Sequence, residues 1–240
     1  MFKPSIAKIY LSGQRDVESS PGFRCHHLFN GDTRFHAYKT ALGDLCRFDD
    51  ILLAAGKSWP RDAGTSAYVV LIPLSGSIEY VIGNSAPGVI SAGQLQVFSI
   101  HENETYRVSN LSPDKGVNYL ELFLVKKPEM PDMVPAPADA DLNKFMNVLL
   151  QVAAVGSGSG DQWRLSIGKF SGRGETTYQR KYPGKGLFMF VIDGLFEVEG
   201  RLLHARDGLA LWDTAEAGVE ARSNEALLLV VESNFSAAVP

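Results

Sequence analysis

Short apolar segments separated by glycine-containing turns recur along this chain, and they restrict its fold more than any other feature. The segments are rich in valine, isoleucine, leucine, phenylalanine and tyrosine, which favour strands, and long helical periods are few. The expected strands are 67–74, 77–82, 95–100, 117–125, 187–192, 195–199, 209–212 and 226–231. Many short strands joined by turns are typical of β-sandwiches and β-barrels, so we expect an all-β protein.

The composition changes in the middle of the chain and divides it in two. Residues 126–137 contain four prolines, which favours an extended linker. Residues 138–141 are suited to cap a short helix that runs to Val152. The Gly-Ser repeat at 156–160 predicts a loop, and no Lys-Ser or Lys-Thr follows it as in a phosphate-binding loop. The predicted organisation is a first domain at 1–125, a linker with a short helix at 126–160 and a second domain at 161–240.

The two halves carry similar segments in the same order. Three pairs match: 76–80 with 194–198, 92–98 with 207–212, and 117–125 with 226–231. An internal repeat of this kind predicts two barrels of one design.

Charge, leader and cysteine content restrict the classes of function. The net charge is −4 and the basic residues are spread among acids, so we expect no nucleic-acid binding. No apolar leader follows Met1 and no run of about 18 apolar residues occurs, so we expect neither a signal peptide nor a membrane span. Two cysteines, Cys25 and Cys46, without a leader indicate reduced thiols in the cytoplasm.

Three further motifs occur in order along residues from about 24 to 232. Residues 201–213 contain Asp-Gly-Leu-Ala, an apolar residue and Trp; residues 27–30 read His-Leu-Phe-Asn; and Asp49-Asp50 is followed by Ala55-Gly56. Together these motifs resemble the cupin superfamily and, within it, the pirin-like bicupins. The resemblance implies an all-β chain of two jelly-roll-type cupin barrels in tandem with little helix.

The first metal-binding motif of pirins is altered here. Pirins place two ligand histidines six and eight residues after a glycine, and a second glycine closes the motif. Gly56 and Gly76 keep that spacing, but Asp62 and Gly64 stand at the histidine positions and Tyr68 at an acidic position.

The second motif has changed in the same way. Pirins place a histidine and a glutamate thirteen and fifteen residues after another glycine. Counted from Gly93, these positions hold Tyr106 and Val108, which strand periodicity places on one face, and the asparagine that follows is kept as Asn110. A mononuclear metal needs about three convergent N or O ligands, so we predict no metal and no cofactor.

An alternative keeps a metal at this position. Asp62, Tyr68, Tyr106 and His101 would then coordinate iron(III), with the metal driving deprotonation of the tyrosines. In the simpler interpretation Tyr68 and Tyr106 fill the vacated space, and His101 is either a general base or an exposed loop histidine.

Five other residues have the side chains of a zinc site: Cys25, His26, His27, His36 and Cys46. Their spacings match no standard zinc finger, and neighbouring residues of a strand point to opposite faces. We expect them at core and edge positions.

The resemblance implies quercetin 2,3-dioxygenase activity or metal-linked interaction with other proteins. Because the metal ligands are replaced, we predict a metal-free bicupin that binds a small molecule or a protein partner without conventional catalysis. The alternatives are a quercetin 2,3-dioxygenase-type oxidoreductase with a non-standard ligand set, and two filled barrels that act through their surface. The predicted pocket residues are Trp59, Asp62, Tyr68, His101, Tyr106 and Val108. We expect this aromatic lining to stack a flat ligand and Asp62 to accept a hydrogen bond from it; the oligomeric state is left open.

Overall fold

Strands make up nearly all the regular structure of the chain. The computed structural model describes residues 6–30, 36–133, 138–139, 142, 145–156 and 162–235. Within these residues the helical elements are two short 3-10 helices, Ser12–Gln14 and Ala37–Lys39. All eight predicted strands are present, and the all-β prediction is confirmed. Two units form, one of Arg15–Asp139 and the other of Met1–Gln14 with Ala140–Pro240.

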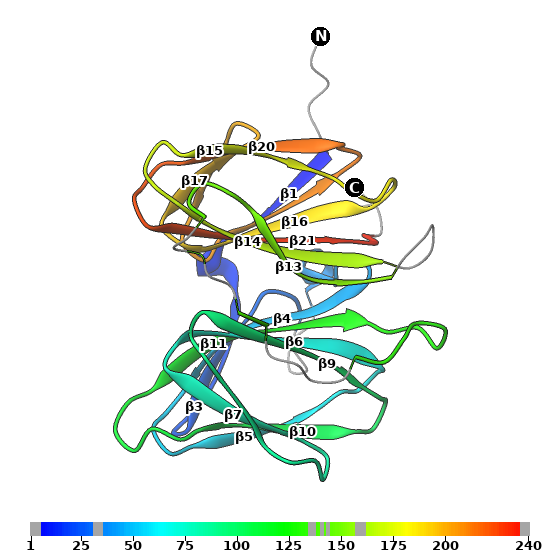
Figure 1. The fold of residues 1–240 in the computed structure, drawn as a ribbon, viewed down its shortest axis with the longest axis vertical. Coiled ribbons are helices and arrows are strands. Elements are labelled where there is room, and N and C mark those ends of the chain that lie inside the picture. The colour runs from blue at the N-terminus through cyan, green and yellow to red at the C-terminus, as the bar shows by residue number, and fades with distance from the viewer. Residues whose placement is uncertain are drawn as a thin grey trace. The chain divides into compact units, whose positions relative to one another are not determined.

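The first unit is a barrel of two facing sheets, shown in the lower half of Figure 1. One sheet has seven strands in the order β12-β9-β6-β11-β4-β3-β2, and the other has four in the order β5-β10-β7-β8. The bounds are β2 Asp16–Ser20, β3 Phe23–His27, β4 Leu45–Leu53, β5 Ser58–Asp62, β6 Ala67–Ser75, β7 Ser77–Ile82, β8 Gly88–Ser91, β9 Gln94–Ile100, β10 Thr105–Asn110, β11 Val117–Val125 and β12 Ala138–Asp139.

The second unit repeats this plan. Its six-stranded sheet has the order β1-β19-β16-β21-β14-β13, and its four-stranded sheet the order β15-β20-β17-β18. The bounds are β1 Ile6–Tyr10, β13 Leu150–Val155, β14 Trp163–Phe170, β15 Glu175–Gln179, β16 Gly186–Asp193, β17 Leu195–Val198, β18 Arg201–His204, β19 Gly208–Trp212, β20 Glu216–Ala221 and β21 Ala226–Ser233. Strands β9-β6-β11-β4-β3 and β19-β16-β21-β14-β13 correspond one to one, in agreement with the internal repeat.

The boundaries between the units differ from those predicted. β1 pairs antiparallel with β19, so the first residues belong to the second unit and not to a domain at 1–125. In the predicted linker, β12 pairs with β9 and β13 pairs with β14, so two strands of this segment belong to the sheets of the units. The described residues between 138 and 155 contain no helix, and 157–160 of the Gly-Ser repeat lie outside the described residues.

Strand alternation decides which side chains fill the first barrel. Ala67, Val69 and Leu71 of β6 belong to the apolar core of the barrel. Tyr68, which lies between the first two of these along the strand, is outside that cluster and on the other face of the sheet. The same alternation on β10 buries Tyr106 and Val108 in the core. The predicted placement of these two residues on one face is therefore confirmed.

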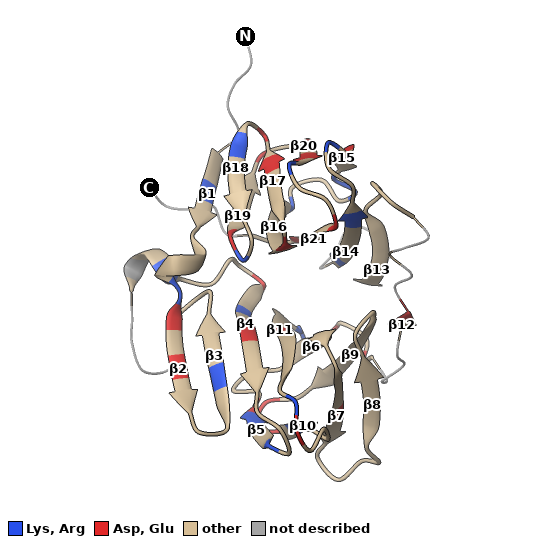
Figure 2. Ribbon diagram, turned by 90° about the vertical axis from the view of Figure 1, so that its left-hand side faces the viewer, with Lys and Arg blue, Asp and Glu red and all other residues tan. Residues whose placement is uncertain are grey.

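Charges of both signs are interspersed on the strands of each unit (Figure 2). Neither 3-10 helix among the described residues has the length or the apolar character needed to cross a membrane.

Candidate functional site

Three neighbouring strands place a row of ionisable side chains on the inner face of the larger sheet of the first barrel. The register pairs Glu121 of β11 with Asp49 of β4, and Asp49 with His27 of β3. Alternate residues of a strand share a face, so a second row follows two residues along each strand. That row comprises Tyr119, Ile51 and Cys25.

Arg61 of β5 reaches the first row from the opposite sheet. Its Nε donates to Glu121 Oε2 at 2.8 Å, and its Nη2 donates to the same oxygen and to Asp49 Oδ2, the latter at 2.5 Å. The Arg61 side chain is 10% exposed, and those of Asp49 and Glu121 are 2% and 0% exposed. Burial acts to lower the pKa of Arg61, but Glu121 and Asp49 together raise it well above its ordinary value. One buried cation is thus shared by two buried carboxylates.

His27 extends this network on the other side of Asp49. Its Nδ1 donates to Asp49 Oδ1 at 2.7 Å, and its Nε2 lies 3.6 Å from Glu18 Oε2. Burial acts to lower the pKa of His27, but the hydrogen bond and charge of Asp49 raise it overall. Burial acts to raise the pKa of Asp49, but His27 and Arg61 lower it overall. Both shifts favour an imidazolium–carboxylate pair.

Two tyrosines complete the polar group. Tyr106 donates its hydroxyl to Glu121 Oε1 at 2.5 Å, whereas the hydroxyl of Tyr119 has no hydrogen-bond partner among the described residues. Burial, followed by the charge of Glu121, raises the pKa of each phenol well above its ordinary value. Both phenols therefore remain neutral, and each keeps a proton that it can donate.

The smaller sheet contributes the remaining inward residues of this region. The register pairs Tyr106 with Arg61 and Val108 with Trp59. The ring of Trp59 stacks on Phe23 with centroids 4.0 Å apart, and the Arg61 guanidinium carbon lies 4.1 Å from the Trp59 ring centroid. Trp59 is thus engaged by side chains of the barrel itself.

Three of the predicted pocket residues lie elsewhere. Asp62 is exposed, and its carboxylate accepts the Gly64 N–H at 2.7 Å. Tyr68, on the outer face of β6, donates its hydroxyl to the Pro131 carbonyl at 2.6 Å. His101 is exposed, with Nε2 3.8 Å from Asp132 Oδ1. Only Trp59, Tyr106 and Val108 of the predicted set come together, and the alternative iron ligands do not converge.

A shift of one residue explains the misplaced aspartate. The gap-free count from Gly56 selects Asp62, but β5 pairs Asp62 with Thr105, so the residues that face inward are Arg61 and Ala63. A one-residue change of position along a strand moves every side chain to the opposite face.

A metal ion of the cupin type does not fit the inward residues opposite Tyr106 and Val108. Arg61 brings a positive charge there, and Trp59 and Val108 offer no ligand atom. Glu121, the nearest carboxylate, already accepts hydrogen bonds from Arg61 and Tyr106.

Three residues of the polar group were not predicted from the sequence: Arg61, Glu121 and Tyr119. One signal was present for Glu121: it is the one charged residue of the mostly apolar strand β11, and charged residues are rarely buried unless paired. Arg61 lies in a short polar strand, β5, whose composition does not distinguish it from a loop.

The second unit has a different polar feature, an open hollow of about 520 Å³ on its smaller sheet. Acidic residues dominate its lining, and Figure 2 shows acidic segments on β17 and β20. Arg222 forms ion pairs with Glu197 at 2.6 Å and with Glu220 at 2.7 Å. The lining residues are Glu175, Thr176, Thr177, Glu197, Glu199, Gly200, Gly218, Val219 and Glu220.

Comparisons with known proteins support the cupin architecture. Residues 161–232 match the family model described as the quercetinase C-terminal cupin domain. YhhW from Escherichia coli is 14% identical over 96% of this chain and 99% of its own, with a TM-score of 0.76. Its nickel(II) complex, titled as a bacterial pirin, gives a TM-score of 0.78 at 14% identity over 96% and 100% of the two chains. No curated protein matches the chain in sequence.

A quercetin 2,3-dioxygenase from Acinetobacter baumannii is also similar. It is 14% identical over 98% of this chain and 88% of its own, with a TM-score of 0.71. The fold and the matched C-terminal domain define the class: this chain is a pirin-like bicupin in architecture. Within that class, its first barrel carries an arginine between two carboxylates.

Proposed function

We propose that this chain acts by binding a small molecule or a protein partner, and that its first barrel carries out no cupin-type oxygen chemistry. One observation carries the proposal: the Arg61 guanidinium bridges Glu121 and Asp49 at the inward position opposite Tyr106. A cation fixed opposite Tyr106 repels a metal ion at that same position and occupies two oxygens there, Glu121 Oε2 and Asp49 Oδ2. Cupin dioxygenases need a metal to bring substrate and oxygen together.

The test measures oxygen and quercetin consumption by protein without an affinity tag. The protein is supplied in turn with iron(II), manganese(II), cobalt(II), nickel(II) and copper(II). We expect no consumption above a protein-free control with any of these metals. Turnover that depends on one metal and on the native fold would overturn the proposal.

An oxidoreductase of the quercetin 2,3-dioxygenase type is the second candidate. It is favoured by the similarity of the second barrel to the quercetinase C-terminal domain and of the whole chain to a protein titled quercetin 2,3-dioxygenase. Its metal would need ligands other than Asp62, Tyr68 and His101, which lie apart from the polar group. The same assay decides between the two candidates.

We also propose a cytoplasmic location. Cys25 and Cys46 are both free thiols, as expected in a reducing compartment.

A further inference from the structure

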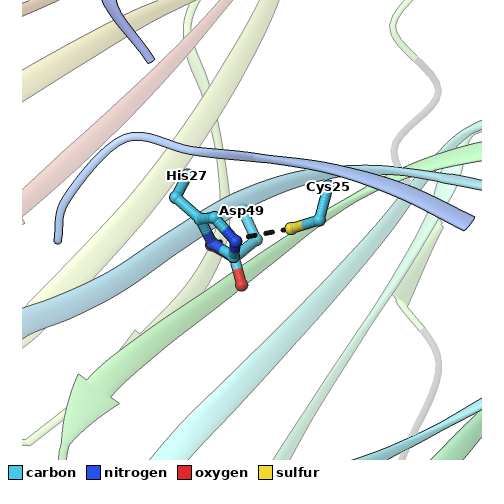
Figure 3. Close-up of side chains that lie close together, drawn as sticks. All are labelled: Cys25, His27 and Asp49. Atoms are coloured by element: carbon cyan, nitrogen blue, oxygen red, sulfur yellow. Dashed lines mark hydrogen bonds and ion pairs between the residues drawn. The ribbon is translucent and has the colours of Figure 1, made fainter. Parts of the chain in front are cut away.

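We infer that Cys25, His27 and Asp49 form a binding site for a thiophilic divalent metal such as zinc(II), separate from the cupin metal position. Figure 3 shows the three side chains turned toward one another, the first two from β3 and the third from β4. One ligand atom from each residue lies within 4.8 Å of the other two. This group provides a thiolate, an imidazole and a carboxylate, which are ligands that zinc(II) accepts.

The distances are near those of a tetrahedral site. Cys25 Sγ lies 3.6 Å from His27 Nδ1. Zinc–sulfur and zinc–nitrogen bonds of about 2.3 and 2.05 Å at a tetrahedral angle place the two ligand atoms about 3.6 Å apart. His27 Nδ1 and Asp49 Oδ1 are 2.7 Å apart, and this pair must open to about 3.3 Å to admit the ion.

The ligands are already oriented by their neighbours. Arg61 binds Asp49 through Oδ2 and leaves Oδ1 directed at His27. On the far side of the ring, Glu18 Oε2 lies 3.6 Å from His27 Nε2. A carboxylate on the second ring nitrogen is the usual outer partner of a metal-binding histidine, because it fixes the tautomer and the ring orientation.

An independent observation comes from Tyr119 on the neighbouring strand β11. Its side chain is fully buried, and its hydroxyl has no hydrogen-bond partner among the described residues. The register places Tyr119 and Cys25 in one row on the inner face, on either side of Ile51, and the charges of Cys25 and Asp49 both act on the Tyr119 hydroxyl. An unpaired buried hydroxyl is costly, and a water molecule or exogenous ligand in the fourth coordination position would accept its hydrogen bond.

The net charge of this buried group does not change when the ion binds. With His27 protonated, Arg61 and His27 offset the charges of Asp49 and Glu121, and Cys25 is neutral while it keeps its thiol proton. When a divalent ion binds, the thiol proton of Cys25 and the imidazolium proton of His27 leave to solvent. Two positive charges enter as two protons leave, so the net charge of the buried group stays unchanged.

This site does not rest on the proposed function. Zinc(II) has no redox chemistry, so a zinc site in the first barrel is compatible with the absence of oxygen chemistry. Its test uses a spectroscopic signal in place of turnover, and therefore the two proposals fail separately.

The experiment titrates cobalt(II), a spectroscopic substitute for zinc(II), into metal-free protein that carries no affinity tag. We expect a thiolate-to-cobalt charge-transfer band in the near ultraviolet, saturating at one equivalent and abolished by one equivalent of zinc(II). Cys25→Ser removes the band and weakens zinc(II) binding by at least about tenfold. His27→Gln weakens binding similarly while retaining both thiols. Cys46→Ser changes the other free thiol, and leaves the band and affinity as in wild type.

Circular dichroism confirms that each variant is folded before titration. If Cys25→Ser is unfolded, His27→Gln and Cys46→Ser still decide the question. Folded wild-type protein with no thiolate band overturns the site. So does a band that persists in Cys25→Ser or disappears in Cys46→Ser.

Discussion

The two barrels share a strand order but differ in what lies inside them. In the first, Arg61 of β5 donates to Glu121 of β11 and to Asp49 of β4. In the second, the corresponding strands are β15 and β21, and here Tyr178 donates to Glu232 at 3.0 Å. Glu232 also accepts the backbone N–H groups of Lys181 and Tyr182. The second barrel thus satisfies one buried carboxylate with neutral donors, whereas the first holds a network of ions.

This difference shows that a barrel of this design does not need a network of buried ion pairs for its stability. Removing ions from water costs several kcal/mol each, and well-packed apolar side chains often stabilise a protein as much or more. The interior of the second barrel is close to that apolar solution, with a core that includes Phe170, Phe196 and Met189. The ionic group of the first barrel is therefore better explained by binding than by folding.

The largest expected effect comes from breaking the ionic network at its cation. Arg61→Met removes the cation shared by Glu121 and Asp49, so that Asp49 keeps only His27 and Glu121 keeps only the neutral hydroxyl of Tyr106. We expect a loss of about 3–5 kcal/mol in the free energy of unfolding at neutral pH. Urea unfolding followed by tryptophan fluorescence measures it. As a control, Arg222→Met removes exposed ion pairs of the second barrel and should leave the unfolding midpoint nearly unchanged. Equal effects from the two variants would mean that the first-barrel network is not truly buried.

The next largest loss of stability is expected from the two tyrosines whose hydroxyls donate to buried glutamates, Tyr106 and Tyr178. Tyr106→Phe removes the hydrogen bond to Glu121 Oε1, and because both Arg61 bonds go to Oε2, it leaves Oε1 without a donor among the described residues. We expect a cost of about 1.5–3 kcal/mol. Tyr178→Phe should cost only about 0.5–1.5 kcal/mol, because Glu232 keeps two backbone donors. Urea unfolding of both variants gives the comparison. A larger loss for Tyr178→Phe would reverse the contrast drawn between the barrels.

A smaller effect should appear in the pH dependence of stability. The pKa of Asp49 is lowered in the folded state, so its contribution is present above its ordinary pKa of about 4 and is lost as pH falls through the folded value. The pKa of His27 is raised, so its contribution is complete below about 6.5 and is lost as pH rises through the folded value. The pair therefore stabilises the first barrel most between about pH 4 and 6.5.

Urea midpoints measured from pH 5 to pH 9 test this dependence. Wild-type protein should lose stability relative to His27→Gln as pH rises across that range. The matched change His204→Gln alters an exposed histidine of the second unit and should leave the wild-type profile intact. Parallel profiles for wild type and His27→Gln would show that His27 is not protonated in the folded protein.

Much of the fold was predictable because its central strands are continuous apolar segments. Four central strands are buried on both faces, namely β6, β11, β16 and β21. Their apolar content alone therefore identifies them as strands. The site was far less predictable. β5 reads Ser-Trp-Pro-Arg-Asp and lacks an apolar run, and its inward residue depends on a pairing with β10 that no local pattern specifies. Likewise, Cys25 and His27 meet Asp49 only through the register of β3 on β4.

The smallest expected effect comes from Tyr119 and distinguishes an ionic core from a ligand site. Tyr119→Phe removes a hydroxyl that has no described partner, so in metal-free protein the free energy of unfolding should change by less than about 0.5 kcal/mol, or rise slightly. In zinc-loaded protein the same change removes a donor to the fourth coordination position and should destabilise the protein relative to wild type. Thermal unfolding with and without zinc(II) provides both comparisons. An equal loss of stability in metal-free and zinc-loaded protein would contradict this role, because a donor to the fourth coordination position matters only when the metal is bound. The hydroxyl would then already bind a resident water molecule.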